Sequence, residues 1–146
     1  MIDGVISISQ LVRYAETDQM GIVHHSTYPI WFEIGRTHYM SVRGHPYSDL
    51  ETGGIILPIS DYWCRMVAPA RYGEEIEIDT WLARAESRRV TFGYQIRRGD
   101  TRLATGGTRL VCVNRDFHPQ RLPEWLRGAM GPELGDTPDL RADGPT

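Results

Sequence analysis

The alternation of apolar and polar residues along the chain predicts five strands. Residues 5–14 are β-branched and roughly alternating, which indicates a first strand. After Gly53-Gly54 the same kind of pattern returns and predicts four more strands, at 55–67, 74–84, 88–98 and 101–115. Because short connections join them, we expect these four strands to form one antiparallel meander.

Two of the predicted strands show which face is buried. In 74–84 one face carries Ile76, Ile78, Thr80 and Leu82, and the other face carries Glu75, Glu77 and Asp79. In 88–98 the residues on one face are Val90, Phe92, Tyr94 and Ile96. Successive side chains of a strand point to opposite faces, so the apolar sets should face a common core.

Between the first strand and the others, the apolar spacing becomes that of a helix. Ser26 or Thr27 can cap its start, and Pro29 falls in the first turn, where the missing N–H does no harm. Gly44 suits its end. The apolar stripe consists of Tyr28, Trp31, Phe32, Gly35, Tyr39 and Val42, widened by Ile30 and Ile34. A glycine inside a helix costs about 1 kcal/mol relative to alanine, so we expect a sheet to pack closely against Gly35.

The remaining segments predict one domain with a tail. Residues 46–52 and 123–130 indicate short helices, whereas 131–146 carry Gly, Pro and Asp and almost no core-forming residues. We therefore expect a single domain at 1–130 and a disordered C-terminal tail at 131–146. One helix cannot cover both faces of a five-stranded sheet. The pattern thus predicts an α+β fold in which a curved sheet wraps around the helix and another subunit buries the remaining surface.

Composition excludes several classes of protein. The chain has 146 residues, of which 40% are hydrophobic and 24% charged, which is typical of one soluble domain. A net charge of −3 argues against nucleic acid as a partner. The N-terminus lacks the pattern of a signal peptide, and no apolar run approaches the roughly 20 residues that span a bilayer, so we expect no stable membrane insertion. Cys64 and Cys112 have no metal-binding spacing and read as buried free thiols, which fits a reducing, cytoplasmic location.

The candidate chemistry lies in the loop before the helix. Asp18 and His25 stand within a dozen residues of a helix start, where free backbone N–H groups and a partial positive charge are found. An acid, a base and an oxyanion binder are the minimum for attack on a carbonyl or thioester. The residues alone leave open that Asp18 only satisfies a local turn and that His25 has no role. A metal site formed with His24 is disfavoured, because adjacent histidines rarely chelate one ion.

The segment from Tyr14 to Phe32, YAETDQMGIVHHSTYPIWF, resembles the signature of the hotdog-fold acyl-CoA thioesterases. Within them it is most similar to the 4-hydroxybenzoyl-CoA thioesterase family and its Tol-Pal-associated relatives. The resemblance implies a hotdog fold, with a five-stranded antiparallel sheet around one central helix. It also implies homodimers with a continuous sheet, often paired into homotetramers. The implied reaction is hydrolysis of an acyl-CoA without a metal or a cofactor, the CoA being part of the substrate.

The same resemblance assigns roles to particular residues. Asp18 falls on the catalytic carboxylate, which acts as nucleophile or general base. His25 falls on a position that is His in one branch and Tyr in another, and its N–H is a candidate oxyanion donor. Gly21 and Tyr28 belong to the same motif and are expected to contact substrate. Arg88 and Arg89 open a predicted strand at which the family carries basic residues for CoA phosphates. Met20 and His24 depart from the usual pattern, which leaves the choice of acyl group open.

Other residues compete for these roles. Glu33 is a rival carboxylate, since another hotdog branch uses a helix Glu. Because Arg36 follows three residues later, we expect Glu33 to be a surface residue or to form a solvated ion pair. Arg65 and Arg71 are weaker candidates for phosphate binding. Three aromatic residues can line an acyl pocket or a dimer interface: Tyr62, Trp63 and Trp81.

Two other functions compete with the thioesterase. One alternative is a hotdog dehydratase or hydratase, which pairs a His with a helix acid in a different motif. The other is a non-catalytic scaffold that binds acyl groups and has no need of Asp18 and His25.

Overall fold

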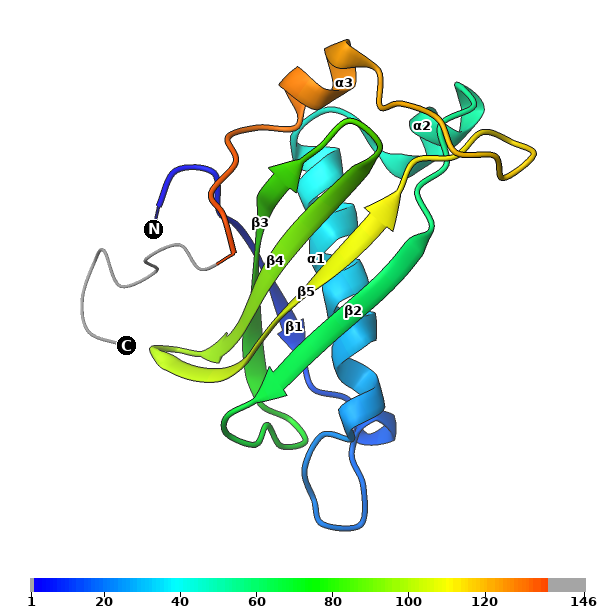
Figure 1. The fold of residues 1–146 in the computed structure, drawn as a ribbon. Coiled ribbons are helices and arrows are strands. Elements are labelled where there is room, and N and C mark those ends of the chain that lie inside the picture. The colour runs from blue at the N-terminus through cyan, green and yellow to red at the C-terminus, as the bar shows by residue number, and fades with distance from the viewer. Residues whose placement is uncertain (1, 137–146) are drawn as a thin grey trace.

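The computed structural model describes residues 2–136 and contains one antiparallel sheet wrapped around one long helix (Figure 1). The strands are β1 (Ile6–Leu11), β2 (Ile59–Met66), β3 (Glu75–Ala85), β4 (Arg89–Arg98) and β5 (Thr101–Val111). The helices are α1 (Tyr28–Val42), α2 (Tyr47–Thr52) and α3 (Glu124–Ala129), and two 3₁₀ turns cover Tyr14–Glu16 and His25–Thr27. The expected α+β architecture is confirmed. No helix within residues 2–136 has the length and apolar character needed to cross a membrane.

The order of the strands corrects one expectation. The sheet runs β1-β3-β4-β5-β2, so β3, β4 and β5 form a meander but β2 does not continue it. Instead β2 pairs with β5 at the far edge, with Trp63 opposite Gly107. The predicted four-strand meander is therefore wrong for β2. The reason is that both sides of β3 are already taken, by β1 along Glu75–Thr80 and by β4.

The inner face of the sheet packs on α1. Trp31, Phe32 and Tyr39 are completely buried there. A Cβ on Gly35 would press against Thr80 Oγ1 and lie 2.8 Å from Ile78 Cγ2, so the expected close approach of sheet and helix is confirmed.

Two residues assigned to the apolar stripe of the helix face solvent instead. Ile30 is 49% exposed and Val42 is 56% exposed. Ile30 lies five residues before Gly35 and so on the opposite side of the helix. Val42 is the last residue of α1. The buried stripe is therefore narrower and shorter than the spacing of apolar residues predicted.

Part of the expected tail is held against the sheet. The Leu134 N–H donates to Leu82 O (2.9 Å) and the Gly135 N–H donates to Ala83 O (3.1 Å), along the part of β3 that β1 does not cover. Residues 131–136 therefore follow the sheet after α3, whereas residues 137–146 of the predicted tail lie outside the described residues.

On the outer face of the sheet, a buried carboxylate accepts hydrogen bonds from several side chains. Asp79 is fully buried and accepts hydrogen bonds from Arg97 Nε (2.8 Å), Gln95 Nε2 (3.0 Å) and Ser7 Oγ (2.5 Å). Burial by itself would lower the pKa of Arg97, but the hydrogen bonds and charge of Asp79 raise it above its usual value. A buried carboxylate with this many donors is a stabilising part of the fold.

Candidate functional site

The segment between the two 3₁₀ turns forms a narrow loop that projects beyond the sheet at the start of α1 (Figure 1). Thr17 pairs with Val23 across its base, and the Asp18 N–H donates to Ile22 O at 2.9 Å. Gly21 lies in the left-handed region, with φ of 81°, and its N–H donates to Asp18 O at 3.0 Å. Gly21 thus allows the tight turn, and its contact with substrate stays a prediction.

The carboxylate of Asp18 is only partly committed to the loop. Its Oδ1 accepts the Met20 N–H at 2.8 Å, which is the local turn that the sequence left open. The other oxygen, Oδ2, accepts no hydrogen bond from residues 2–136, and the residue is partly exposed. Asp18 therefore serves the turn with one oxygen and keeps the other available for chemistry.

The two histidines differ in what they do. His24 accepts the Ser26 N–H on Nδ1 (3.2 Å) and contacts Ser26 Oγ (2.7 Å), so His24 caps the 3₁₀ turn. Thr27 is the N-cap residue of α1, as expected, but its side chain makes no capping hydrogen bond. The ring of His25 stacks on that of His24, with centroids 4.2 Å apart, and is exposed.

The backbone N–H groups at this turn single out one donor. Those of Ser26 and Thr27 bond to His24. The His25 N–H has no acceptor among the described residues. It is thus the donor that this helix start leaves for a ligand.

Glu16 is a site residue that the sequence analysis missed. It is only 5% exposed, and its carboxylate accepts hydrogen bonds from the Arg13 N–H (2.7 Å) and from Trp31 Nε1 (3.1 Å). Its own carbonyl accepts the His24 N–H at 2.8 Å. One residue therefore ties both ends of the loop to α1. The spacing from Arg13 to Glu16, which is that of a capping box, was the available signal.

Tyr28 begins α1 and packs in the core. Its ring is 2% exposed and meets Trp31 edge to face, with centroids 5.4 Å apart. Burial, with a smaller effect of Cys64, raises the pKa of Tyr28, so its hydroxyl is protonated at neutral pH. Contact of Tyr28 with substrate stays a prediction.

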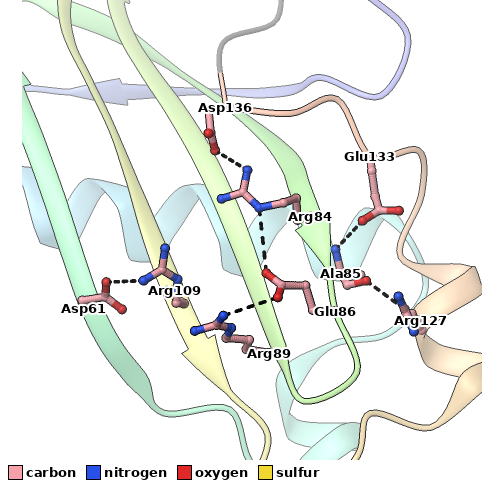
Figure 2. Close-up of polar contacts among 9 residues, drawn as sticks. All are labelled: Asp61, Arg84, Ala85, Glu86, Arg89, Arg109, Arg127, Glu133 and Asp136. Atoms are coloured by element: carbon pink, nitrogen blue, oxygen red, sulfur yellow. Dashed lines mark hydrogen bonds and ion pairs between the residues drawn. The ribbon is translucent and has the colours of Figure 1, made fainter.

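Arg88 and Arg89 lie at the opposite end of the sheet from the loop. They follow the turn between β3 and β4 and border a cavity of about 320 Å³, together with Ser87, Cys112 and Pro119. Arg89 contacts Glu86 at 3.4 Å (Figure 2), whereas Arg88 makes no ion pair within residues 2–136. The 15-residue α1, about 22 Å long, runs between the two ends. One subunit therefore does not bring Asp18 and the two arginines together.

The structure also places the residues that competed for the catalytic and phosphate-binding roles. Glu33 is exposed, so its expected place on the surface is confirmed. Arg36 is buried, and the described residues contain no ion pair between the two, so the pair itself does not form. Arg65 lies on β2, far from the turn that carries Arg88. Arg71 lies beside the loop, opposite Ile22. No group of His, Cys, Asp and Glu side chains in residues 2–136 is arranged to hold a metal.

The three aromatic candidates for an acyl pocket or a dimer interface lie in different surroundings. A cavity of about 410 Å³ on the outer face is lined by Trp63 and Trp81, but Trp81 is 3% exposed and donates to Gly135 O at 2.9 Å. Trp81 is therefore covered by the C-terminal segment. Tyr62 and Trp63 are exposed on the edge strand β2. Both cysteines are free, as expected, but only Cys112 is buried, whereas Cys64 on the edge strand β2 is half-buried. Burial raises the pKa of both thiols.

Comparison with known proteins adds to this geometry. Residues 12–130 match the family model described as thioesterase-like superfamily. A putative acyl-CoA thioesterase of Bacillus subtilis, YneP, is 37% identical over 78% of this chain and 87% of its own. A DHNA-CoA thioesterase from Staphylococcus aureus has a similar structure, with a TM-score of 0.80 and 34% identity, over 86% of this chain and 87% of its own. A hypothetical protein from Thermus thermophilus has a TM-score of 0.81 and 38% identity, over 86% of this chain and 95% of its own.

Proposed function

Because this chain belongs to the thioesterase-like superfamily, we propose that it hydrolyses acyl-CoA thioesters with Asp18 as the catalytic carboxylate. It has the hotdog fold and is a thioester hydrolase. One observation carries the residue assignment. Asp18 keeps one oxygen free of hydrogen bonds from the described residues, in a loop that backbone hydrogen bonds hold at its base and tip and that ends at an open backbone donor.

The His25 N–H supplies that donor. In the proposed reaction it binds the carbonyl oxygen of the thioester as negative charge develops there, and the positive end of α1 adds to the effect. Its imidazole is exposed and can carry a proton to or from water. A fixed donor of this kind typically contributes about 10²–10³ in rate.

Asp18 can act in two ways. As a nucleophile, the carboxylate attacks the carbonyl carbon, the CoA thiolate leaves, and water hydrolyses the resulting anhydride to the free acid. As a general base, it takes a proton from a water molecule, and that water attacks the same carbon. Both routes yield the acid and CoA, and both require the ionised carboxylate.

A second subunit completes the proposed site. β2 pairs with β5 on one side only, and it is exposed along most of its length. Exposed edges of this kind are usually covered, and a two-fold pair is the commonest solution. Antiparallel pairing of β2 with its copy places the loop end of one subunit beside the β3–β4 end of the other. This arrangement would bring Arg88 and Arg89 to the phosphates of a CoA held at Asp18.

A thiol-release assay over a panel of acyl-CoAs tests this proposal. The panel contains short, long and aromatic acyl groups, because the structural relatives include a DHNA-CoA thioesterase. Release of CoA that is lost in Asp18→Asn supports the assignment. A dehydratase would change the acyl chain without releasing CoA, and a scaffold would bind the acyl-CoA unchanged, so either result would contradict it.

Light scattering tests the shared site. The chain has a mass of 16.6 kDa, and we expect at least twice that mass at micromolar concentration. A fully active monomer would show that Asp18 and the arginines do not act across an interface.

A further inference from the structure

Three hydrogen-bond donors gather between α1 and the sheet. Arg36, on the inner side of α1, is only 7% exposed. Burial raises the pKa of the Tyr47 and Tyr94 hydroxyls, and the nearby guanidinium of Arg36 opposes that rise at both. The Tyr94 hydroxyl is 2.6 Å from Thr108 Oγ1. This contact uses the hydrogen of either Tyr94 or Thr108. The hydrogen of the other hydroxyl therefore remains available to donate to a ligand.

The acceptors in this cluster are neutral hydroxyl oxygens, and no carboxylate of the described residues pairs with its one positive charge. Within residues 2–136 no carboxylate forms an ion pair with Arg36, and neither Arg36 Nη1 nor the Tyr47 hydroxyl has a hydrogen-bond partner, although both atoms are buried. Arginine stays protonated in proteins. Burial outweighs the effect of Arg36 and raises the pKa of Tyr94 to about 12, so this hydroxyl stays protonated too.

An arginine on the outer face of the sheet, unlike Arg36, is paired with a carboxylate. Arg97 is more exposed than Arg36, and yet it is bonded to the buried Asp79. Glu33 lies one turn from Arg36 on the same helix but stays in solvent. A buried charge without a counter-ion is costly. Arg36 thus forms a buried cationic cluster with two tyrosines, and the described residues supply no ion-paired carboxylate for it.

We propose that Arg36, Tyr47 and Tyr94 bind a carboxylate, and that this carboxylate is the far end of the acyl group. The inference rests on the proposed thioesterase function. Arg36 lies eight residues after Tyr28, about 12 Å along the helix from its start, and its side chain leans back towards that start. Phe32, stacked on Tyr94 with centroids 4.3 Å apart, lies between the two points and offers an apolar wall for the chain. The substrate class is therefore an acyl-CoA that ends in a carboxylate.

Matched pairs of substrates test the acyl part. Adipoyl-, suberoyl- and sebacoyl-CoA end in a carboxylate, and hexanoyl-, octanoyl- and decanoyl-CoA are their methyl-ended counterparts. We expect the wild type to prefer the first set. In Arg36→Met, kcat/KM should fall by about tenfold or more on the carboxylate-ended set and stay within about twofold on the other. Arg36→Lys should retain part of the preference, because it keeps the charge but not the planar fork.

A control arginine separates this effect from a general loss of charge. Arg102 lies on β5 and donates to Gln95 Oε1 at 2.7 Å on the outer side of the sheet. Arg102→Met should leave the preference between the two sets unchanged. Equal losses on both sets in Arg36→Met would overturn the proposal. The proposal would also be overturned if Arg36→Met lost the dimer and the wild type showed no preference for carboxylate-ended acyl-CoAs. That result would assign Arg36 to a contact between subunits.

A binding measurement decides the matter without activity. Free suberate should raise the Tm of the wild type, octanoate should raise it less, and Arg36→Lys should respond more weakly to suberate. No difference between suberate and octanoate would reject the carboxylate site even if Arg36→Met did not fold. If suberate raised the Tm but the enzyme did not prefer carboxylate-ended acyl-CoAs, the site would bind a free carboxylate. The proposal that it binds the far end of the acyl group would then be rejected. Absence of CoA release from every substrate would contradict the proposed function alone.

Discussion

Two aspartates on this chain are held in very different ways. Asp79, on the outer face of the sheet, is fully buried and is bonded by Arg97, Gln95 and Ser7. Asp18, in the loop before α1, is partly exposed and accepts one hydrogen bond, from the Met20 N–H. A carboxylate that is surrounded by donors stabilises the fold, whereas one that keeps an oxygen open can react. Carboxylate chemistry in this protein is therefore expected at the loop and not on the sheet.

Glu16 stands between these two cases. Its carboxylate is buried and bonded like that of Asp79, but its partners are Arg13 and Trp31, and its carbonyl holds His24. Its hydrogen bonds therefore position the loop that carries Asp18. Burial and bonding alone do not tell whether a residue matters to the reaction, and the element that it holds in place decides this.

Exchanging the two aspartates for asparagine gives the largest expected contrast. Asp18→Asn should lower kcat by about 100-fold or more, because the amide keeps the shape but cannot attack or accept a proton. Asp79→Asn should leave kcat nearly unchanged and lower the free energy of unfolding by about 1–3 kcal/mol. CoA release and urea unfolding measure the two effects. A residual rate within about tenfold of wild type in Asp18→Asn would remove this residue from the mechanism.

Glu16→Gln tests the intermediate case. We expect kcat to fall by roughly tenfold, since small misplacements of a catalytic group are costly in rate, while KM changes little. The matched control is Asp79→Asn, which loses a comparable buried carboxylate away from the loop. If the two variants lose the same stability and Glu16→Gln keeps full kcat, then Glu16 is structural only.

The two arginines at the far end of the sheet should affect binding more than chemistry. Arg88→Ala with Arg89→Ala is expected to raise KM for acyl-CoA by about tenfold with a smaller change in kcat, because phosphate contacts are the same in ground and transition states. A truncated thioester without the nucleotide should be affected less. Arg109→Ala, which breaks a pair with Asp61 (Figure 2), serves as the control. Equal losses on both substrates would place Arg88 and Arg89 outside the CoA site.

The smallest effect is expected at an exposed ion pair. Arg84 Nη1 lies 2.7 Å from Asp136 Oδ1, and Arg84 also lies near Glu86 (Figure 2). Arg84→Met should change the free energy of unfolding by less than about 1 kcal/mol, since exposed pairs contribute little. It should leave kcat and KM unchanged. A clear loss of activity in this variant would mean that charged residues outside the loop and the β3–β4 turn also take part.

Much of the fold and the centre of the site could be predicted from local patterns. Alternation at 74–84 and 88–98 correctly placed Ile78 and Phe92 in the core, although the opposite face is buried as well, as Asp79 and Gln95 show. Gly35 predicted the close packing of sheet and helix. The loop around Asp18 was recognised from its own residues. These features depend on neighbours in sequence, because side-chain direction within a strand or helix follows from its regular geometry.

Only the tertiary structure decided which segments meet. The alternation in β2 cannot tell that its neighbour is β5 rather than β3, since pairing depends on the edges that other strands leave open. The spacing from Glu33 to Arg36 suggested an ion pair, but the packing of α1 buries one residue and exposes the other. Likewise, the separation of Asp18 from Arg88 follows from the length and direction of α1. The sequence by itself therefore determined the elements, the strand faces that pack on α1 and the loop that carries Asp18. Long-range packing determined the edge strand, the support by Glu16 and the burial of Arg36.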